Sequence, residues 1–161
     1  MQWRQGLLGR NQSGFTLVEL MIVVVLLSIL AIFVTQNTSG LQGVNLGAAS
    51  KKMQSDLRYA QNLAMTTGDS HGLQVLGPTT YRIYNVVTNA VVESPYDHEP
   101  MTENFVEDYL GVNVDVADQA VDIRFNAYGQ PTTGAETIQL EIGSDAMSVQ
   151  VTATSGFVSI L

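Results

Sequence analysis

The most apolar stretch of the chain lies close to its N-terminus. Residues 17–34 read LVELMIVVVLLSILAIFV, in which sixteen of eighteen positions are apolar and the exceptions are Glu19 and Ser28. A helix rises about 1.5 Å per residue, so residues 15–34 would extend about 30 Å, the thickness of a bilayer's hydrocarbon core. The pattern predicts one membrane-spanning helix. A secretory signal peptide is the alternative, but no clear small-x-small cleavage site follows the run.

A second helical pattern follows the apolar run and is amphipathic. Three glycines between residues 37 and 47 each weaken a helix by up to about 1 kcal/mol relative to alanine, which predicts a bend or a loosened stretch there. The residues Thr67-Gly68-Asp69 predict the end of the helix. Apolar residues recur at every third or fourth position and predict a face that packs on a sheet: Leu46, Ala49, Met53, Leu57, Ala60 and Ala64.

Beyond residue 70 the apolar period changes to two, which is typical of half-buried strands. A possible hairpin about Thr88-Asn89 joins two valine pairs. The strands should form an antiparallel sheet whose one face is covered by the amphipathic helix, so the predicted fold class is α+β. The alternation predicts strands around residues 73–75, 81–85, 121–125, 138–142, 147–151 and 158–160.

Composition and charge exclude several classes of function. The chain has 161 residues, which suits one modest domain, and no cysteine, so disulfides, thiolate metal sites and a cysteine nucleophile are excluded. Seven basic against fifteen acidic side chains give a net charge of -8, which argues against nucleic-acid binding. Arg4 and Arg10 precede the apolar run, so the N-terminus should lie in the cytoplasm and the later residues outside.

Glu19 does not suit a plain membrane anchor. A carboxylate deep in lipid costs about 2 to 3 kcal/mol or more. One explanation is that Glu19 stays near the start of the helix, where the helix dipole favours a negative charge. Another is that the chain is cut after Gly14, because the new ammonium group at Phe15 would lie four residues before Glu19 on the same helix face.

The segment Gly14-Phe15-Thr16-Leu17-Val18-Glu19, behind a short basic leader and ahead of an apolar run, resembles the type IV prepilin motif. The resemblance implies that prepilin peptidase cuts after Gly14, that the new N-terminus at Phe15 is methylated, and that Glu19 acts in assembly. In an assembled filament, the glutamate can neutralise the terminal amine of a neighbouring subunit, so that the helices pack in register.

Two further segments, residues 55–64 and 123–131, resemble the GspH/FimT group of minor type II secretion pseudopilins and minor type IV pilins. This resemblance implies a type IV pilin-like fold, with a long N-terminal helix packed on antiparallel sheet, and a structural subunit that initiates or tips a filament. It also implies three kinds of partner: prepilin peptidase, other pilins or pseudopilins, and an inner-membrane assembly platform. The sequence does not separate type II secretion from a type IV pilus.

The resemblance also sets the expected domain organisation. Residues 1–14 would be the leader peptide, 15–36 the transmembrane and assembly helix, 37–68 its amphipathic continuation and 69–161 a β-rich globular head. The protein would be a single-pass inner-membrane protein with a cytoplasmic N-terminus and a periplasmic head, and would join a filament after assembly.

Two departures narrow the resemblance. Many major pilins carry a proline at the position where this chain has Gln36, which favours a minor pilin. Some members of the group bind DNA through arginines in the C-terminal tail, but residues 155–161 contain none. A role in DNA uptake is therefore the least favoured of the hypotheses.

Nine carboxylates and no Lys or Arg occur between residues 93 and 122, a pattern typical of a solvated surface that can also face a basic partner. Calcium is a second interpretation, with Asp115, Asp118 and Asp122 as candidate ligands, although no EF-hand loop pattern is present. An alternative function is therefore an uncleaved, single-span membrane protein whose acidic head binds calcium or a soluble ligand.

No enzymatic site is predicted. His71 and His98 are the only histidines, and neither has a partner at a recognisable spacing. No serine lies in a Gly-x-Ser-x-Gly context, and Gly129-Gln130-Pro131 is a turn rather than a phosphate loop. Apart from calcium, the sequence predicts no cofactor.

Overall fold

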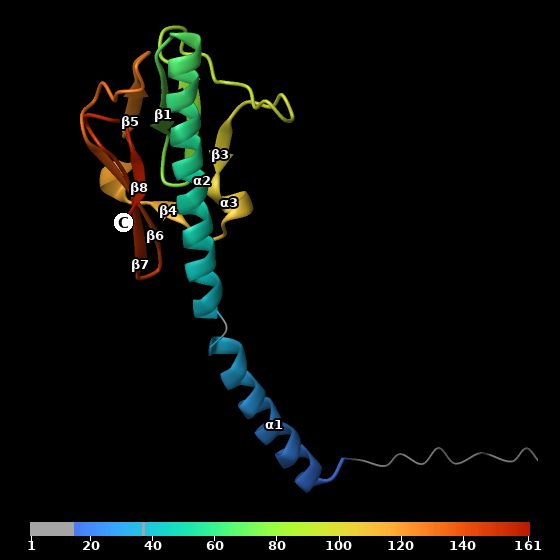
Figure 1. The fold of residues 1–161 in the computed structure, drawn as a ribbon. Coiled ribbons are helices and arrows are strands. Elements are labelled where there is room, and N and C mark those ends of the chain that lie inside the picture. The colour runs from blue at the N-terminus through green and yellow to red at the C-terminus, as the bar shows by residue number, and fades with distance from the viewer. Residues whose placement is uncertain (1–14, 37) are drawn as a thin grey trace, which may run out of the picture. The chain divides into compact units, whose positions relative to one another are not determined.

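The computed structural model describes residues 15–36 and 38–161 (Figure 1). The chain divides into two compact units, residues 1–38 and 39–161. The first unit contributes the helix α1, Leu17–Gln36, and the second contains nearly all of the helix α2, Thr38–Thr67, together with every strand.

The predicted apolar stripe of helix α2 is confirmed, because all six residues of the stripe are at least 98% buried. The helix ends at Thr67, where the sequence placed its end. Gly68 has a φ of +79° and its N–H donates to the carbonyl of Ala64 at 3.1 Å, which is the usual glycine cap of a helix C-terminus.

The predicted bend or loosened stretch at residues 37–47 does not occur within residues 38–47, which are helical; α1 ends at Gln36 and α2 begins at Thr38. Gly43 and Gly47 lie inside α2, which runs without interruption from Thr38. The glycine penalty is small beside the continuous backbone ladder and the burial of Leu46 and Ala49. Residue 37 lies outside the described residues.

The head contains two four-stranded antiparallel sheets, where the residue pattern had predicted one. In the first sheet the order is β3-β2-β1-β5, with β1 at His71–Val75, β2 at Thr80–Asn85, β3 at Thr102–Asn104 and β5 at Asp122–Phe125. In the second the order is β4-β6-β7-β8, with β4 at Asn113–Val114, β6 at Glu136–Ile142, β7 at Asp145–Val151 and β8 at Val158–Ile160.

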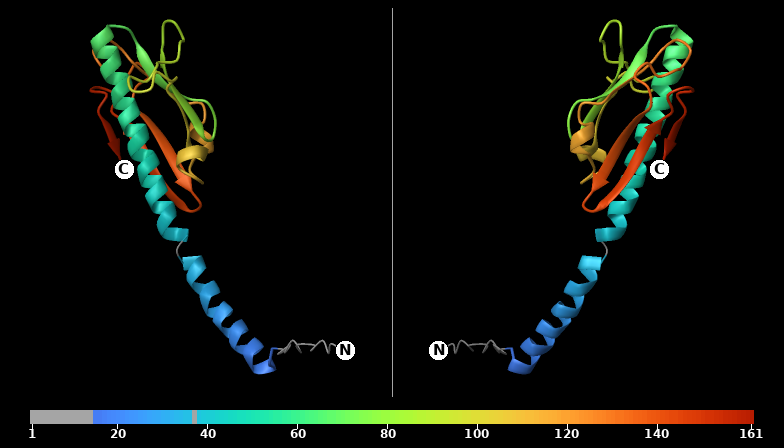
Figure 2. Two further views of the ribbon diagram at one scale, coloured as in Figure 1. Left: turned by 90° about the vertical axis from the view of Figure 1, so that its right-hand side faces the viewer. Right: turned by 90° about the vertical axis from the view of Figure 1, so that its left-hand side faces the viewer.

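The core lies where α2 runs alongside both sheets (Figure 2). Leu73 on β1 is paired with Ile83 on β2 and Ile123 on β5, and all three are fully buried with Ile138 and Leu140 of β6 in the same cluster. Strand alternation therefore faces the apolar side chains of each sheet toward the helix, as the period of two predicted.

The last strand is held against the helix by polar contacts. The carbonyl oxygen of Val158 on β8 accepts from Arg58 at 2.8 Å and from Gln54 at 3.1 Å, both on α2. Because β8 is the edge of its sheet, these side chains occupy a backbone acceptor that an incoming strand would otherwise use.

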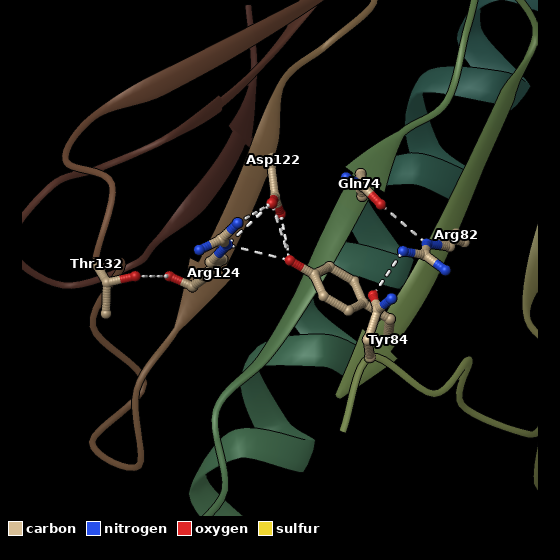
Figure 3. Close-up of polar contacts among 7 residues, drawn as sticks. Gln74, Arg82, Tyr84, Asp122, Arg124 and Thr132 are labelled. Carbon is tan, nitrogen blue, oxygen red and sulfur yellow. Dashed lines mark hydrogen bonds and ion pairs between the residues drawn. The ribbon is translucent and has the colours of Figure 1, made fainter. Parts of the chain in front are cut away.

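The outer face of the first sheet carries a polar network (Figure 3). The Tyr84 hydroxyl donates to Asp122 at 2.8 Å, and Arg124 contacts the same carboxylate at 2.6 Å. Arg82 lies over the Tyr84 ring, 5.0 Å from its centroid, and donates to Gln74. The network joins β2 to β5 across the intervening β1.

The acidic segment between residues 93 and 122 was predicted as a solvated surface, but it also forms helices and strands. It contains β3, the short helix α3 at Phe105–Asp108, β4 and the 3-10 turn η1 at Val116–Asp118. Phe105 is fully buried, and its ring centroid lies 5.5 Å from that of Tyr81. The predicted hairpin at residues 86–92 is reduced to a turn closed by the isolated bridge between Tyr84 and Val91.

Candidate functional site

The N-terminal site consists of the residues around the start of α1. The backbone N–H of Glu19 donates to the Thr16 side-chain oxygen at 3.2 Å, and the N–H of Leu20 donates to the Thr16 carbonyl at 3.1 Å. Thr16 is therefore the N-cap, and Glu19 occupies the third helical position. Gly14, the predicted cleavage residue, lies outside the described residues.

This spacing is that of a capping box, Thr-x-x-Glu. The same pattern in the sequence could have predicted where the helix begins. It places the Glu19 carboxylate in the first turn, where the helix dipole favours a negative charge. Phe15 is 80% exposed and Glu19 is also exposed. Among the described residues Glu19 makes no salt bridge.

The apolar side chains of α1 point in every direction around the helix. Each large apolar side chain from Leu17 to Leu30 exposes between 41% and 75% of its surface. A helix that is apolar all round requires burial in lipid or among other helices.

Within the part of the chain that the structure describes, no helix is both long enough and apolar enough to cross a membrane. The predicted span, residues 15–34, ends in residues whose side chains lie outside those described.

The three candidate calcium ligands have different partners. Asp115 caps η1 through the N–H of Ala117, and Asp118 accepts from the backbone N–H of Gln139 at 2.8 Å. Asp122 belongs to the network of Figure 3. In residues 15–36 and 38–161 no three His, Asp or Glu side chains are grouped so that they could hold a metal ion. The structure thus does not bring the three carboxylates together as a site.

The two histidines are also separate. His71 is buried in β1 with Nδ1 3.0 Å from the carbonyl oxygen of Asp69, whereas His98 is exposed in a loop with a φ of +60°. Neither contributes to a recognisable catalytic set in the described chain.

The comparisons with known proteins concern the N-terminal motif and the fold. Residues 9–35 match the prokaryotic N-terminal methylation motif. The structure resembles that of the type IV minor pilin FimU of Pseudomonas aeruginosa, with 14% identity, a TM-score of 0.54, and coverage of 72% of this chain and 87% of that one. This chain has the fold of type IV pilin-like proteins and carries an N-terminal methylation motif.

A second similar structure is the minor pseudopilin EpsH from the type 2 secretion system of Vibrio cholerae. It is 12% identical, has a TM-score of 0.55, and the match covers 73% of this chain and 96% of that one. No curated protein matches the sequence. The predicted α+β pilin fold, a long N-terminal helix packed on antiparallel sheets, is confirmed.

The pilin-like head contains one polar cluster that was not predicted from the sequence. Asp56 on α2 accepts from the Tyr81 hydroxyl and from Lys52, both at 2.7 Å, and Lys52 also reaches Glu103 at 2.9 Å. Burial lowers the pKa of Lys52, but hydrogen bonds with the two carboxylates outweigh it and the net pKa is raised. The only signal in the sequence was the i,i+4 pair Lys52 and Asp56, since Tyr81 and Glu103 are distant along the chain.

Proposed function

We propose that this chain is a minor pilin or minor pseudopilin, cleaved by prepilin peptidase and assembled through its N-terminal helix into a type IV pilus or a type II secretion pseudopilus. One observation carries the proposal: a methylation motif at residues 9–35 leads into a capped helix whose apolar side chains are exposed on all sides. Such a helix needs neighbours, and a filament of identical or related helices supplies them.

Cleavage between Gly14 and Phe15, followed by methylation of the Phe15 amine, would leave a cationic N-terminus beside the first turn of α1. Glu19 then has a natural partner in the amine of a neighbouring subunit. Pairing matters most in an apolar surrounding, where an unpaired carboxylate is costly, so a helix that enters the bundle out of register would be penalised.

The location follows from the same segment. Residues 15–34 would anchor the protein in the inner membrane before assembly, with the N-terminus in the cytoplasm and the head in the periplasm. The partners would be prepilin peptidase, other pilins or pseudopilins and an inner-membrane assembly platform. The exposed Phe15 and Glu19 are the residues that we expect these steps to use.

The test is a comparison of Glu19→Ala with Ser28→Ala in cells that form the filament. Ser28 is matched because it lies in the same helix and only returns a hydrogen bond to the carbonyl of Val24 at 2.7 Å. After shearing, the Ser28→Ala protein should appear in the filament fraction as the wild type does, whereas the Glu19→Ala protein should stay in the membrane.

The alternative is an uncleaved single-span protein whose acidic head binds a ligand. In that case Glu19→Ala would have no effect on the distribution of the protein between the two fractions, and the assembly proposal would be wrong.

A further inference from the structure

A cavity of about 950 Å³ opens between α2, β3, α3 and the loop of residues 94–101. Its volume is in the range of ligand pockets, which is about 300–1,000 Å³. All of its lining belongs to the unit of residues 39–161, so a ligand of this cavity is independent of the N-terminal assembly proposed above.

Asp56, which lines this cavity, has a carboxylate oxygen that accepts no hydrogen bond from the described chain. The Asp56 side chain is only 9% exposed, and both of its hydrogen bonds, from Tyr81 and Lys52, are made to Oδ2. Its Oδ1 has no hydrogen-bond partner in the described chain. Glu103 is similar, since its side chain is 17% exposed and Oε2 alone contacts Lys52. Neither oxygen is fully buried, because the described part of the chain holds no fully buried side-chain oxygen without a hydrogen-bond partner. Both oxygens can therefore accept from a donor that enters the cavity.

The charge of the cavity lining indicates the charge of the group that would donate to these oxygens. Besides Asp56 and Glu103, its lining includes Asp97, Glu99 and Asp108, against the single cation Lys52. Hydrogen bonds from Ser94 and from the backbone N–H of Glu99 hold the pKa of Asp97 below its usual value, so Asp97 stays ionised to lower pH than a free aspartate. The cavity therefore has a negative potential, which attracts a cationic group.

The shape and chemistry of the walls indicate which cation. Three tyrosines line the cavity: Tyr59 and Tyr109, which are half-buried, and Tyr96, which is 94% exposed. Aromatic faces beside carboxylates suit the planar guanidinium group, which stacks on rings and donates in a fork. A bare metal ion is less suited, because Lys52 already occupies the space between Asp56 and Glu103.

We propose that this cavity is a docking site for an arginine side chain of a partner protein. The guanidinium group would donate to Asp56 and Glu103 and lie between the tyrosine rings, while Glu99 and Asp108 attract it from the surface. The partner is thus a protein that presents an exposed arginine to the head. The arginine comes from the partner and not from this chain.

The test uses the full chain in an uncharged detergent and three fluorescently labelled peptides that alternate glycine with arginine, lysine or citrulline. Citrulline has nearly the shape of arginine but no charge. Fluorescence anisotropy at physiological ionic strength should give the tightest binding for the arginine peptide, binding about threefold or more weaker for the lysine peptide, and none for the citrulline peptide.

Two variants locate the binding. Asp108→Asn should weaken the arginine peptide about threefold to tenfold, whereas Glu107→Gln is a matched control, because Glu107 is its exposed neighbour on α3 and does not line the cavity. Thermal melts establish that both variants are folded. The proposal is overturned if millimolar arginine peptide does not bind, if arginine and lysine or citrulline peptides bind equally, or if the two variants weaken binding equally.

Discussion

The hydroxyl of Tyr81 donates a hydrogen bond of 2.7 Å to Oδ2 of Asp56 inside the interface between α2 and the first sheet. Tyr81 is 1% exposed and Asp56 is 6% exposed, so the bond is shielded from water. It is a directional contact within an otherwise apolar surface, and it therefore fixes how the helix is placed along the strand.

Removing this hydroxyl tests its contribution to the head. Tyr81→Phe should lower the free energy of unfolding by about 1 to 3 kcal/mol, because Asp56 loses a donor that water cannot readily replace. Tyr84→Phe is the matched control, since Asp122 keeps Arg124 as a partner at 2.6 Å. Urea titration in detergent should show the larger loss for Tyr81→Phe. An equal loss in the two variants would contradict the assigned role.

The contact between Tyr81 and Asp56 should also make the head less stable at high pH. Burial, and then the charge of Asp56, raise the pKa of Tyr81 well above its usual value near 10. A group whose pKa is raised by folding stabilises the fold below its unfolded pKa, and this contribution is lost as the pH rises above about 10. The raised pKa of Lys52 acts in the same direction.

The free energy of unfolding should therefore fall as the pH rises above about 10, and fall less steeply in Tyr81→Phe. Unfolding curves of both proteins at several pH values measure this. The explanation fails if the two proteins lose stability in parallel.

Two glycines should respond to alanine in opposite ways. A Cβ atom at Gly72 on β1 would lie 2.6 Å from the carbonyl oxygen of Ile123, so Gly72→Ala should destabilise the head by about 1 to 3 kcal/mol. Gly47 in α2 has open space, and Gly47→Ala should stabilise the head by about 0.5 to 1 kcal/mol. Thermal melts compare them, and a stabilising Gly72→Ala would show that β1 and β5 are not as close as described.

Much of the fold could be predicted from the sequence, because a helix or strand that buries one face has a regular spacing of apolar residues. The stripe from Leu46 to Ala64 has helical spacing and is buried as a whole, and the alternation at residues 138–142 and 147–151 became β6 and β7. Periodicity gives each strand's buried face but not its neighbours, so the division into two sheets was not predictable.

The acidic segment and the cavity were not predictable for a related reason. The elements β3 and β4 have only three and two residues, too few to show alternation, and they exist because of contacts with β2 and β6. Asp56 looks like an exposed helix residue until Tyr81 is brought over it by the fold. The N-terminal site was legible because Gly14 to Glu19 are contiguous in the chain.

Calcium should leave the stability of the head unchanged. Asp115, Asp118 and Asp122 are each engaged with different partners, and the described residues offer no group of three ligands. Thermal melts with millimolar calcium and with a chelator should have the same midpoint. A higher midpoint with calcium would revive the calcium hypothesis.

The N-terminal mass of the protein, extracted from the membranes of cells that contain prepilin peptidase, tests the proposed processing and assembly most directly. We expect a chain that begins at Phe15 and carries one methyl group on its amine, and a chain that begins at Met1 when the peptidase is deleted. A chain that begins at Met1 in cells with active peptidase would contradict the proposed function.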